Sequence, residues 1–100
     1  MQIQHKEARR SENVSQSNGE FFVIVNGKKA ILDYTISGKE MDIFHTFTDE
    51  ELRGQGLAEQ LTQAAFEHAK KNGLKVIPTC DYVKSFLKKH PEWNSLAEHW

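Results

Sequence analysis

The sequence predicts one mixed α+β domain with the element order β-β-β-α-β-α. Two β-rich runs joined by an Asn-Gly dipeptide come first, and a helical period over residues 57–72 follows them. A length of 100 residues leaves room for a single core. The same length excludes a doubly wound dinucleotide enzyme and an α/β barrel.

The first residues carry little sign of regular structure. Residues 1–18 are rich in Gln, Ser, Asn and charged side chains, and their apolar residues follow neither the strand period nor the helix period. We therefore expect a flexible lead-in over residues 1–13, although the part near Val14 could add an edge strand.

A β-hairpin is predicted next. Residues 21–25 are β-branched and aromatic, and Asn26-Gly27 is the strongest two-residue hairpin signal. Residues 30–36 supply the returning strand.

A third strand over residues 41–48 follows a turn at residues 37–39, which completes an antiparallel meander. Alternation along this strand places four side chains on one face, which we expect to point inward: Met41, Ile43, His45 and Phe47.

The main helix is predicted over residues 57–72, and Gly73 is a typical C-terminal cap. Its apolar stripe is rich in alanine, which lets the helix lie close to a sheet: Leu57, Leu61, Ala64, Ala65, His68 and Ala69. Phe66 falls off this stripe, and a contact on the other side of the helix is the one account that the pattern offers.

A strand and a short helix complete the predicted domain. Residues 75–80 read as a strand that the helix connects in a right-handed parallel crossover, with Pro78 at an edge, a bulge or an early strand end. Residues 82–90 read as a helix ended by Pro91, with four side chains inward: Tyr82, Val83, Phe86 and Leu87. Residues 94–100 form a tail, and the pattern gives no role to Trp93 or Trp100.

Composition narrows the function classes. Thirteen basic and fourteen acidic residues give a net charge of −1, so neither nucleic acid nor an anionic membrane is expected as the main partner. The longest apolar run, residues 21–25, is too short to span a membrane, and a lone Cys80 fits a reducing compartment. We expect a soluble cytoplasmic protein. No His or Cys pair has a metal-ligand spacing, so no metal is expected.

The most informative segment is the glycine loop, residues 53–58, which opens the main helix. Closely spaced Gly54 and Gly56 at a helix N-terminus favour anion binding by backbone N–H groups. A P-loop is excluded because no Gly-Lys-Ser/Thr run exists. A dinucleotide fingerprint is excluded because Glu59 stands where a small residue is needed.

The glycine loop matches the pattern Arg/Gln-x-x-Gly-x-Gly/Ala, and here the sequence resembles the GNAT superfamily of N-acetyltransferases. His45-Thr46, Pro78-Thr79-Cys80 and the ending at residues 89–92 strengthen the likeness. The resemblance covers residues 14–93, which we take as the domain, and points to a short branch of that superfamily.

The resemblance implies a GNAT-like core and acetyl-CoA as the cofactor. Arg53 would add a positive charge, and backbone N–H groups of the glycine loop would hold the CoA pyrophosphate. The residues concerned are Arg53, Gly54, Gln55, Gly56, Leu57 and Ala58. The preceding strand would part from residues 76–80 and bind the pantetheine arm through its backbone, at Thr46, Phe47 and Thr48.

Two residues are candidates for catalysis. Cys80 would lie near the thioester as nucleophile or proton donor, or else be a packed small hydrophobe. His45 is the best general base by its ordinary pKa, although an inward histidine is more often a core residue. Tyr82 could also protonate the CoA thiolate, while its spacing favours the core.

The sequence thus predicts an N-acetyltransferase that moves acetyl from acetyl-CoA to an amine of a small molecule or a protein. The alternative is a non-catalytic CoA-binding or protein-interaction module with the same fold. The Asn26-Gly27 hairpin replaces the helices that wall the acceptor site in larger superfamily members, which leaves that side open and the acceptor undetermined. A monomer or a homodimer is expected.

Overall fold

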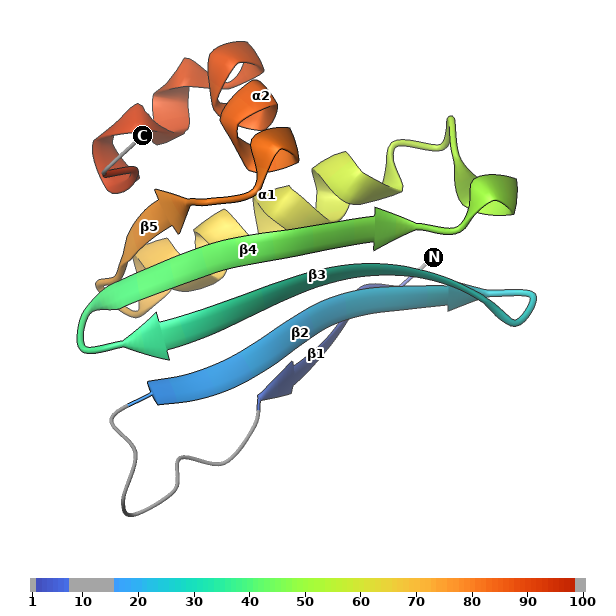
Figure 1. Ribbon diagram of the computed structural model, residues 1–100. Helices are drawn as coiled ribbons and strands as arrows, with labels where there is room; N and C mark the ends of the chain where they lie inside the picture. The colour runs from blue at the N-terminus through green and yellow to red at the C-terminus, as the bar shows by residue number, and fades with distance from the viewer. Residues whose placement is uncertain (1, 8–15, 99–100) are drawn as a thin grey trace.

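The computed structural model describes residues 2–7 and 16–98. One five-stranded sheet has the order β1 (Gln4–Glu7), β2 (Gln16–Val25), β3 (Lys28–Ser37), β4 (Glu40–Thr48) and β5 (Lys75–Pro78) (Figure 1). The first four strands pair antiparallel, and β4 pairs with β5 in parallel. The remaining elements are η1 (Glu50–Leu52), α1 (Leu57–Lys71), α2 (Asp81–Lys89) and η2 (Pro91–Leu96). The predicted α+β class and element order are confirmed, with one strand added at the N-terminus.

The N-terminal residues were predicted as a flexible lead-in, and for Gln4–Glu7 this is wrong. These four residues form β1, which runs antiparallel to β2 with Gln4 opposite Phe22 and Glu7 opposite Gly19. All four side chains are exposed, so backbone hydrogen bonds rather than an apolar pattern define the strand. The possible edge strand near Val14 lies outside the described residues.

The predicted hairpin is confirmed. Asn26 and Gly27 both have positive φ, 50° and 77°, as a type I′ turn requires. Its strands are longer than predicted, because β2 begins at Gln16, opposite Ser37. The two-residue turn fixes the pairing register along their whole length.

A β-bulge in β4 overturns the prediction for His45 and Phe47. Tyr34 lies opposite Ile43, but Asp33 lies opposite His45, so Phe44 is an extra residue in β4. Met41 and Ile43 are buried as predicted. Beyond the bulge the alternation is reversed, and both His45 and Phe47 are exposed, on the face away from α1.

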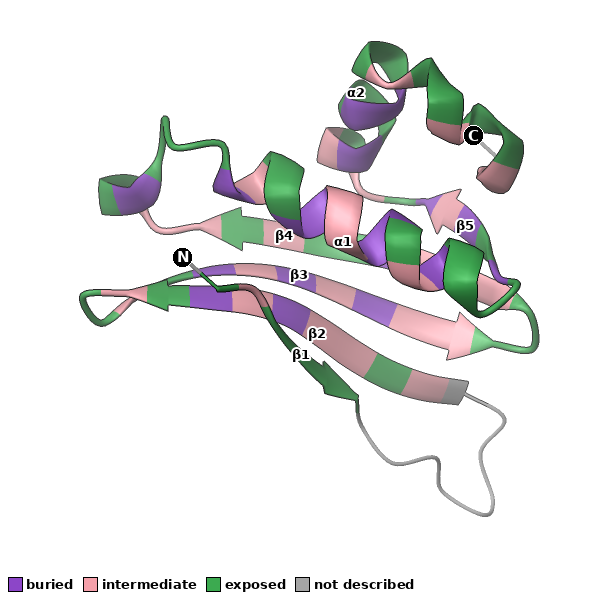
Figure 2. Cartoon of the chain, turned by 180° about the vertical axis from the view of Figure 1, so that it is seen from behind, coloured by how far each residue is buried: buried purple, intermediate pink, exposed green. Residues whose placement is uncertain are grey.

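The helix α1 covers one face of the sheet (Figure 2). Its end is a Schellman motif around Gly73, where the Leu74 N–H donates to the Ala69 carbonyl at 2.8 Å. Leu57, Leu61, Ala65 and Ala69 are buried as predicted, whereas Ala64 and His68 are only partly covered. Phe66 is fully buried on the other side, with its ring 5.4 Å from Phe86 and 5.6 Å from Trp93.

The C-terminal elements pack beside β5 and against α1. Pro78 is the last residue of β5, in agreement with an early strand end. Val83, Phe86 and Leu87 are buried as predicted, but Tyr82 is partly exposed. The predicted tail is not separate from the sheet, because the Glu98 N–H donates to the Val76 carbonyl at 2.9 Å. Trp100 lies outside the described residues.

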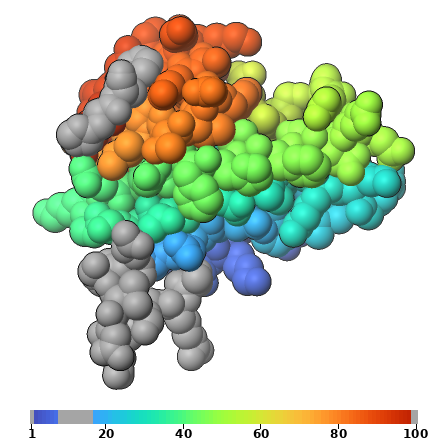
Figure 3. Space-filling view, viewed as in Figure 1, coloured from blue at the N-terminus to red at the C-terminus, as the bar shows by residue number. Residues whose placement is uncertain are grey.

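The sheet face turned away from α1, here called the outer face, has no helix over it in the described part of the chain (Figures 1 and 3). Ile24, Phe44 and Phe47 are each about half exposed, at 52%, 48% and 47%. Within residues 2–7 and 16–98, no helix is long and apolar enough to cross a membrane.

Candidate functional site

The strands β4 and β5 part in the middle of the sheet. Their parallel pairing ends at Ile43 opposite Pro78, directly before the bulge at Phe44. Past this point the Cys80 N–H donates to the Ile43 carbonyl at 3.0 Å, and the chain turns into α2. Within the part of the chain that the structure describes, the rest of β4 pairs with β3 alone, so its backbone edge toward β5 has no strand partner from residue 45 to residue 48.

The glycine loop lies at the end of β4, where α1 begins. Gly54 and Gly56 have φ of 86° and 72°, a conformation that costs other residues about 1–2 kcal/mol. A Cβ built on either glycine would meet no atom within 4 Å, so space is open in front of the loop backbone. Within the described residues, no protein oxygen accepts a hydrogen bond from the amides of residues 54–58. Together with the positive end of α1, these amides form an anion cradle.

A pocket of about 310 Å³ lies at the glycine loop. It brings together the end of β4, the loop, the first turn of α1 and the start of α2, through Thr48, Leu52, Arg53, Gly54, Gly56, Leu57, Ala58, Glu59 and Tyr82. Most of the residues proposed from sequence as a CoA site therefore line one cavity. Thr46, Phe47 and Gln55 do not line it.

Tyr82 was expected mainly in the core, but it lines this pocket. Burial, and secondly the charge of Glu59, raise the pKa of the Tyr82 phenol. The phenol is therefore neutral at physiological pH and presents an O–H donor next to the glycine loop.

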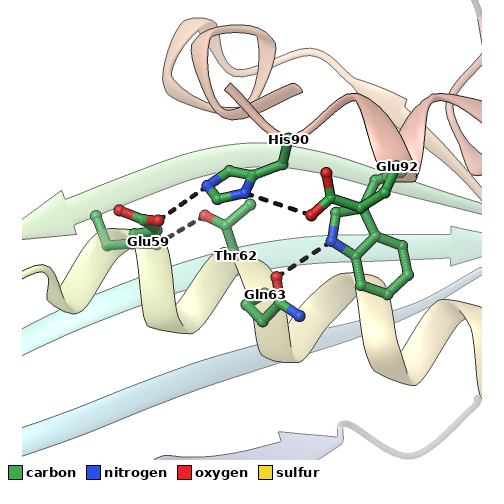
Figure 4. Close-up of polar contacts among 7 residues, drawn as sticks. Glu59, Thr62, Gln63, His90 and Glu92 are labelled. Carbon is green, nitrogen blue, oxygen red and sulfur yellow. Dashed lines mark hydrogen bonds and ion pairs between the residues drawn. The ribbon is translucent and has the colours of Figure 1, made fainter. Parts of the chain in front are cut away.

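Polar contacts hold the end of α2 and the start of η2 against the first turns of α1 (Figure 4). His90 Nε2 lies 2.8 Å from Glu59 Oε1, and its Nδ1 lies 3.5 Å from Glu92 Oε2. The Trp93 indole N–H donates to Gln63 Oε1 at 3.1 Å, which gives Trp93 the role that sequence did not. These contacts position Glu59 and the α2 wall of the loop pocket.

Cys80 lies in the gap between the parted strands. It is partly buried, and its Sγ is 3.5 Å from Thr46 Oγ1 of β4. Because the bulge reverses β4, Thr46 and not His45 faces this gap. The two predicted catalytic residues therefore lie on different faces of the sheet, Cys80 beside Thr46 and His45 on the outer face.

Sequence reasoning missed a row of two acidic residues and a histidine on the outer face, Glu20, Asp33 and His45, here called the acidic row. Glu20 lies opposite Asp33 on β3, and Asp33 lies opposite His45 on β4. Burial and then the hydrogen bond and charge of Glu20 raise the pKa of Asp33 to about 6. The Asn26-Gly27 turn fixes the hairpin register, so the pairing of Glu20 with Asp33 could have been counted from the sequence.

A cavity of about 230 Å³ lies at the row's β2 end, lined by Lys6, Asn18, Gly19, Glu20 and Asp33. The carboxylates of the row favour a cation there, and the Lys6 ammonium in the same cavity wall opposes one. Glu20 is partly offset by Lys29, whose Nζ is 3.7 Å from Glu20 Oε1.

Comparison with known proteins identifies the fold and family. Residues 20–96 match the family model described as GCN5-related N-acetyl-transferase. The Protein NATD1 of Danio rerio is 32% identical over 94 residues, covering 91% of this chain and 77% of the relative. The Protein NATD1 of Xenopus tropicalis is 35% identical over 75 residues, covering 72% and 69%.

A solved structure agrees with these relatives. The solution NMR structure of a GCN5-like protein from Staphylococcus aureus superimposes with a TM-score of 0.66 at 29% identity, covering 92% of this chain and 87% of that one. The glycine loop and the parted strands lie inside the matched region. This chain belongs to the GCN5-related N-acetyltransferase family.

Proposed function

We propose that this protein transfers an acetyl group from acetyl-CoA to an amine. The observation that carries the proposal is the anion cradle of the glycine loop, placed at the end of a strand whose edge is open toward β5. The anion site lies at the end of the open strand edge. This arrangement suits a ligand with a pyrophosphate at one end and an amide-rich arm at the other.

The chain's own groups fit such a ligand. Amides of residues 54–58 would hold the pyrophosphate, and Arg53 would add positive charge at the pocket wall. The Asp49 N–H donates to the Lys29 carbonyl of β3, so strand alternation turns the backbone groups of Phe47 toward β3. The amide and carbonyl groups of Thr46 and Thr48 face the open edge and would bind the pantetheine arm as a further strand binds a sheet edge. The thioester would then lie in the gap near Cys80.

The reaction places clear demands on the surrounding side chains. The amine nitrogen forms a bond to the acetyl carbon, the carbon–sulfur bond breaks, the nitrogen loses a proton and the CoA thiolate gains one. The Cys80 thiol, in the gap, and the Tyr82 phenol, in the loop pocket, are the candidate proton donors to the thiolate. His45 is the candidate base for an amine that approaches over the outer face.

The acidic row supports a cationic amine as the acceptor. Glu20 and Asp33 lie beside His45 on a face with no helix over it in the described residues, so their charges would attract an ammonium group before His45 removes its proton. An open face of this kind admits a peptide or protein amine as well as a small molecule.

A second reading is a CoA-binding module without turnover. It is favoured by the separation of Cys80 and His45 on different faces and by the open acceptor side. Release of free CoA thiol distinguishes the two, because binding alone releases none.

The test follows thiol release from acetyl-CoA with polyamines and lysine-containing peptides as acceptors, using the wild type and the variants Cys80→Ala, Tyr82→Phe and His45→Gln. Loss of a proton-transfer residue should lower kcat about 100-fold or more. Lys84→Gln, an exposed change at the outer side of α2, is the matched control and should keep full activity.

Two results would contradict the proposal. A thermal shift with CoA but no thiol release above hydrolysis would support the binding module. No thermal shift at millimolar CoA would exclude the cofactor assignment itself.

A further inference from the structure

A second cluster of chemically able side chains lies far from the glycine loop. His5 and Glu7 of β1 lie next to His68 of α1, and among the described residues their ligand atoms all fall within 4.8 Å of one another. His68 stands in the last turn of α1, so a rise of about 1.5 Å per residue places it about 18 Å from Gly56. The cluster is independent of the CoA site.

The cluster is assembled from elements distant in sequence. His5 and Glu7 are two apart on a strand, so they share a face, and the pairing of β1 with β2 sets them beside α1. The expectation of no metal rested on ligand spacing along the chain, which cannot detect residues that strand pairing brings together.

Packing fixes the orientation of the two histidine rings. His5 stacks on Phe21 with ring centres 3.9 Å apart, and the His68 ring meets it edge-on at 4.6 Å. His5 Nε2 is hydrogen-bonded to the hydroxyl of the buried Tyr34, while His68 Nε2 lies 3.4 Å from Glu7 Oε1. Gly19 permits this arrangement, because a Cβ there would collide with the Tyr34 ring.

We propose that His5, Glu7 and His68 form a zinc-binding site that fastens β1 to α1. Two imidazoles and one carboxylate are a ligand set that Zn²⁺ takes in proteins, with a water in the fourth position. Zinc bonds to nitrogen and oxygen ligands are about 2.0–2.2 Å long. Small movements of the exposed Glu7 and the partly exposed His68 would bring the ligand atoms to this distance from one metal ion.

The consequence is structural. All residues of β1 are exposed and the strand has only four residues, so little apolar burial holds it in place. A metal bound by two β1 residues and one α1 residue would tie this edge strand to the helix layer and close the β2 edge against other chains.

The experiment is titration of the tag-free 100-residue chain with ZnCl₂, by calorimetry and by thermal unfolding. We expect one Zn²⁺ per chain and a rise in Tm of about 10 °C at 100-fold excess over Kd. Cobalt substitution should give the visible absorption of a tetrahedral site. Absence of stoichiometric binding would overturn the proposal.

Variants identify the ligands. Glu7→Gln and His68→Gln should each weaken Zn²⁺ binding at least tenfold while leaving the metal-free Tm nearly unchanged. His90→Gln is the matched control, a histidine that also contacts two carboxylates but lies at the α2 end, and it should bind Zn²⁺ like the wild type. Equal binding by the wild type and both ligand variants would refute the assignment.

Discussion

Asp33 shows how one carboxyl group can make stability depend on pH. Its pKa is raised from 3.8 to about 6 in the folded chain by burial and by Glu20. An acid with a raised folded pKa stays protonated in the native state while the unfolded chain has already ionised. Its destabilising effect is therefore absent below pH 4, grows between pH 4 and pH 6, and is complete above pH 6, as these two pKa values set.

Asp33→Asn should remove this effect and keep a donor toward the Glu20 carboxylate. We expect the variant to be more stable at pH 7 by about 1 kcal/mol, allowing for solvent screening of a partly exposed group, and equal to the wild type at pH 3.5 or below. Urea unfolding at a series of pH values measures the difference. A gain that does not depend on pH would mean that ionisation of Asp33 is not its cause.

The same substitution separates stability from function. If the acidic row binds a cationic acceptor, Asp33→Asn should raise KM for the amine severalfold with CoA affinity unchanged. An unchanged KM would place the acceptor elsewhere.

Gly56 and Gly38 form a matched pair for testing the glycine loop. Both have positive φ, 72° and 61°, and open space at the Cβ position, so alanine costs each about 1 kcal/mol and lowers Tm by about 4–8 °C. Only Gly56 lies in the loop. Gly56→Ala should therefore lose most of the thermal shift with CoA, and Gly38→Ala should keep it. An equal loss in both variants would mean that the loop backbone does not hold the ligand.

At the scale of elements, local signals were predictable and nonlocal ones were not. Asn26-Gly27 and Gly73 encode their turn and helix end within a few residues, and both features are present where the sequence placed them. The strand β1 has no apolar period and exists through pairing with β2. The extra residue Phe44 in β4 has no signature of its own, so the face of His45 could not be read from alternation.

In the candidate site, too, the local feature was predictable from the sequence and the nonlocal ones were not. The glycine loop is a contiguous motif whose residues, apart from Gln55, line one pocket, as a motif within one turn can be expected to do. The positions of Tyr82 in that pocket and of Cys80 beside Thr46 depend on how α2 packs and where β4 and β5 part, which no single segment encodes.

Phe66 packs between α1 and the C-terminal helices, which explains why it lies off the apolar stripe of α1. The stripe covers the sheet, while Phe66 is fully buried between Phe86 and Trp93. Phe66→Ala should cost about 3–5 kcal/mol, a large share of the stability of a domain this small. Phe44→Ala, at a ring 48% exposed, should change stability by about 0.5 kcal/mol or less. Urea denaturation compares them, and similar losses would contradict the proposed packing.

At the scale of the whole molecule, helices cover one face of the sheet and the outer face stays open in the described residues. The family match spans residues 20–96, so β1 and the first residues of β2 lie outside it. The glycine loop and the parted strands are both inside the matched region. The strand β1, outside the span of the family model, contacts β2 and α1 through His5 and Glu7.

This division predicts the effect of removing residues 1–15. The shortened chain loses the β1–β2 hydrogen bonds and the His5 ring that covers Phe21, which should lower stability by about 1–3 kcal/mol. It should still bind CoA with the wild-type affinity, because the glycine loop and β4 make no pairing with β1, and it should bind no zinc. Circular dichroism melts with and without each ligand measure all three quantities. Loss of CoA binding in a folded, shortened chain would contradict the independence of the two sites, and it would point to Ile3, which lines a pocket with Gly56 of the glycine loop.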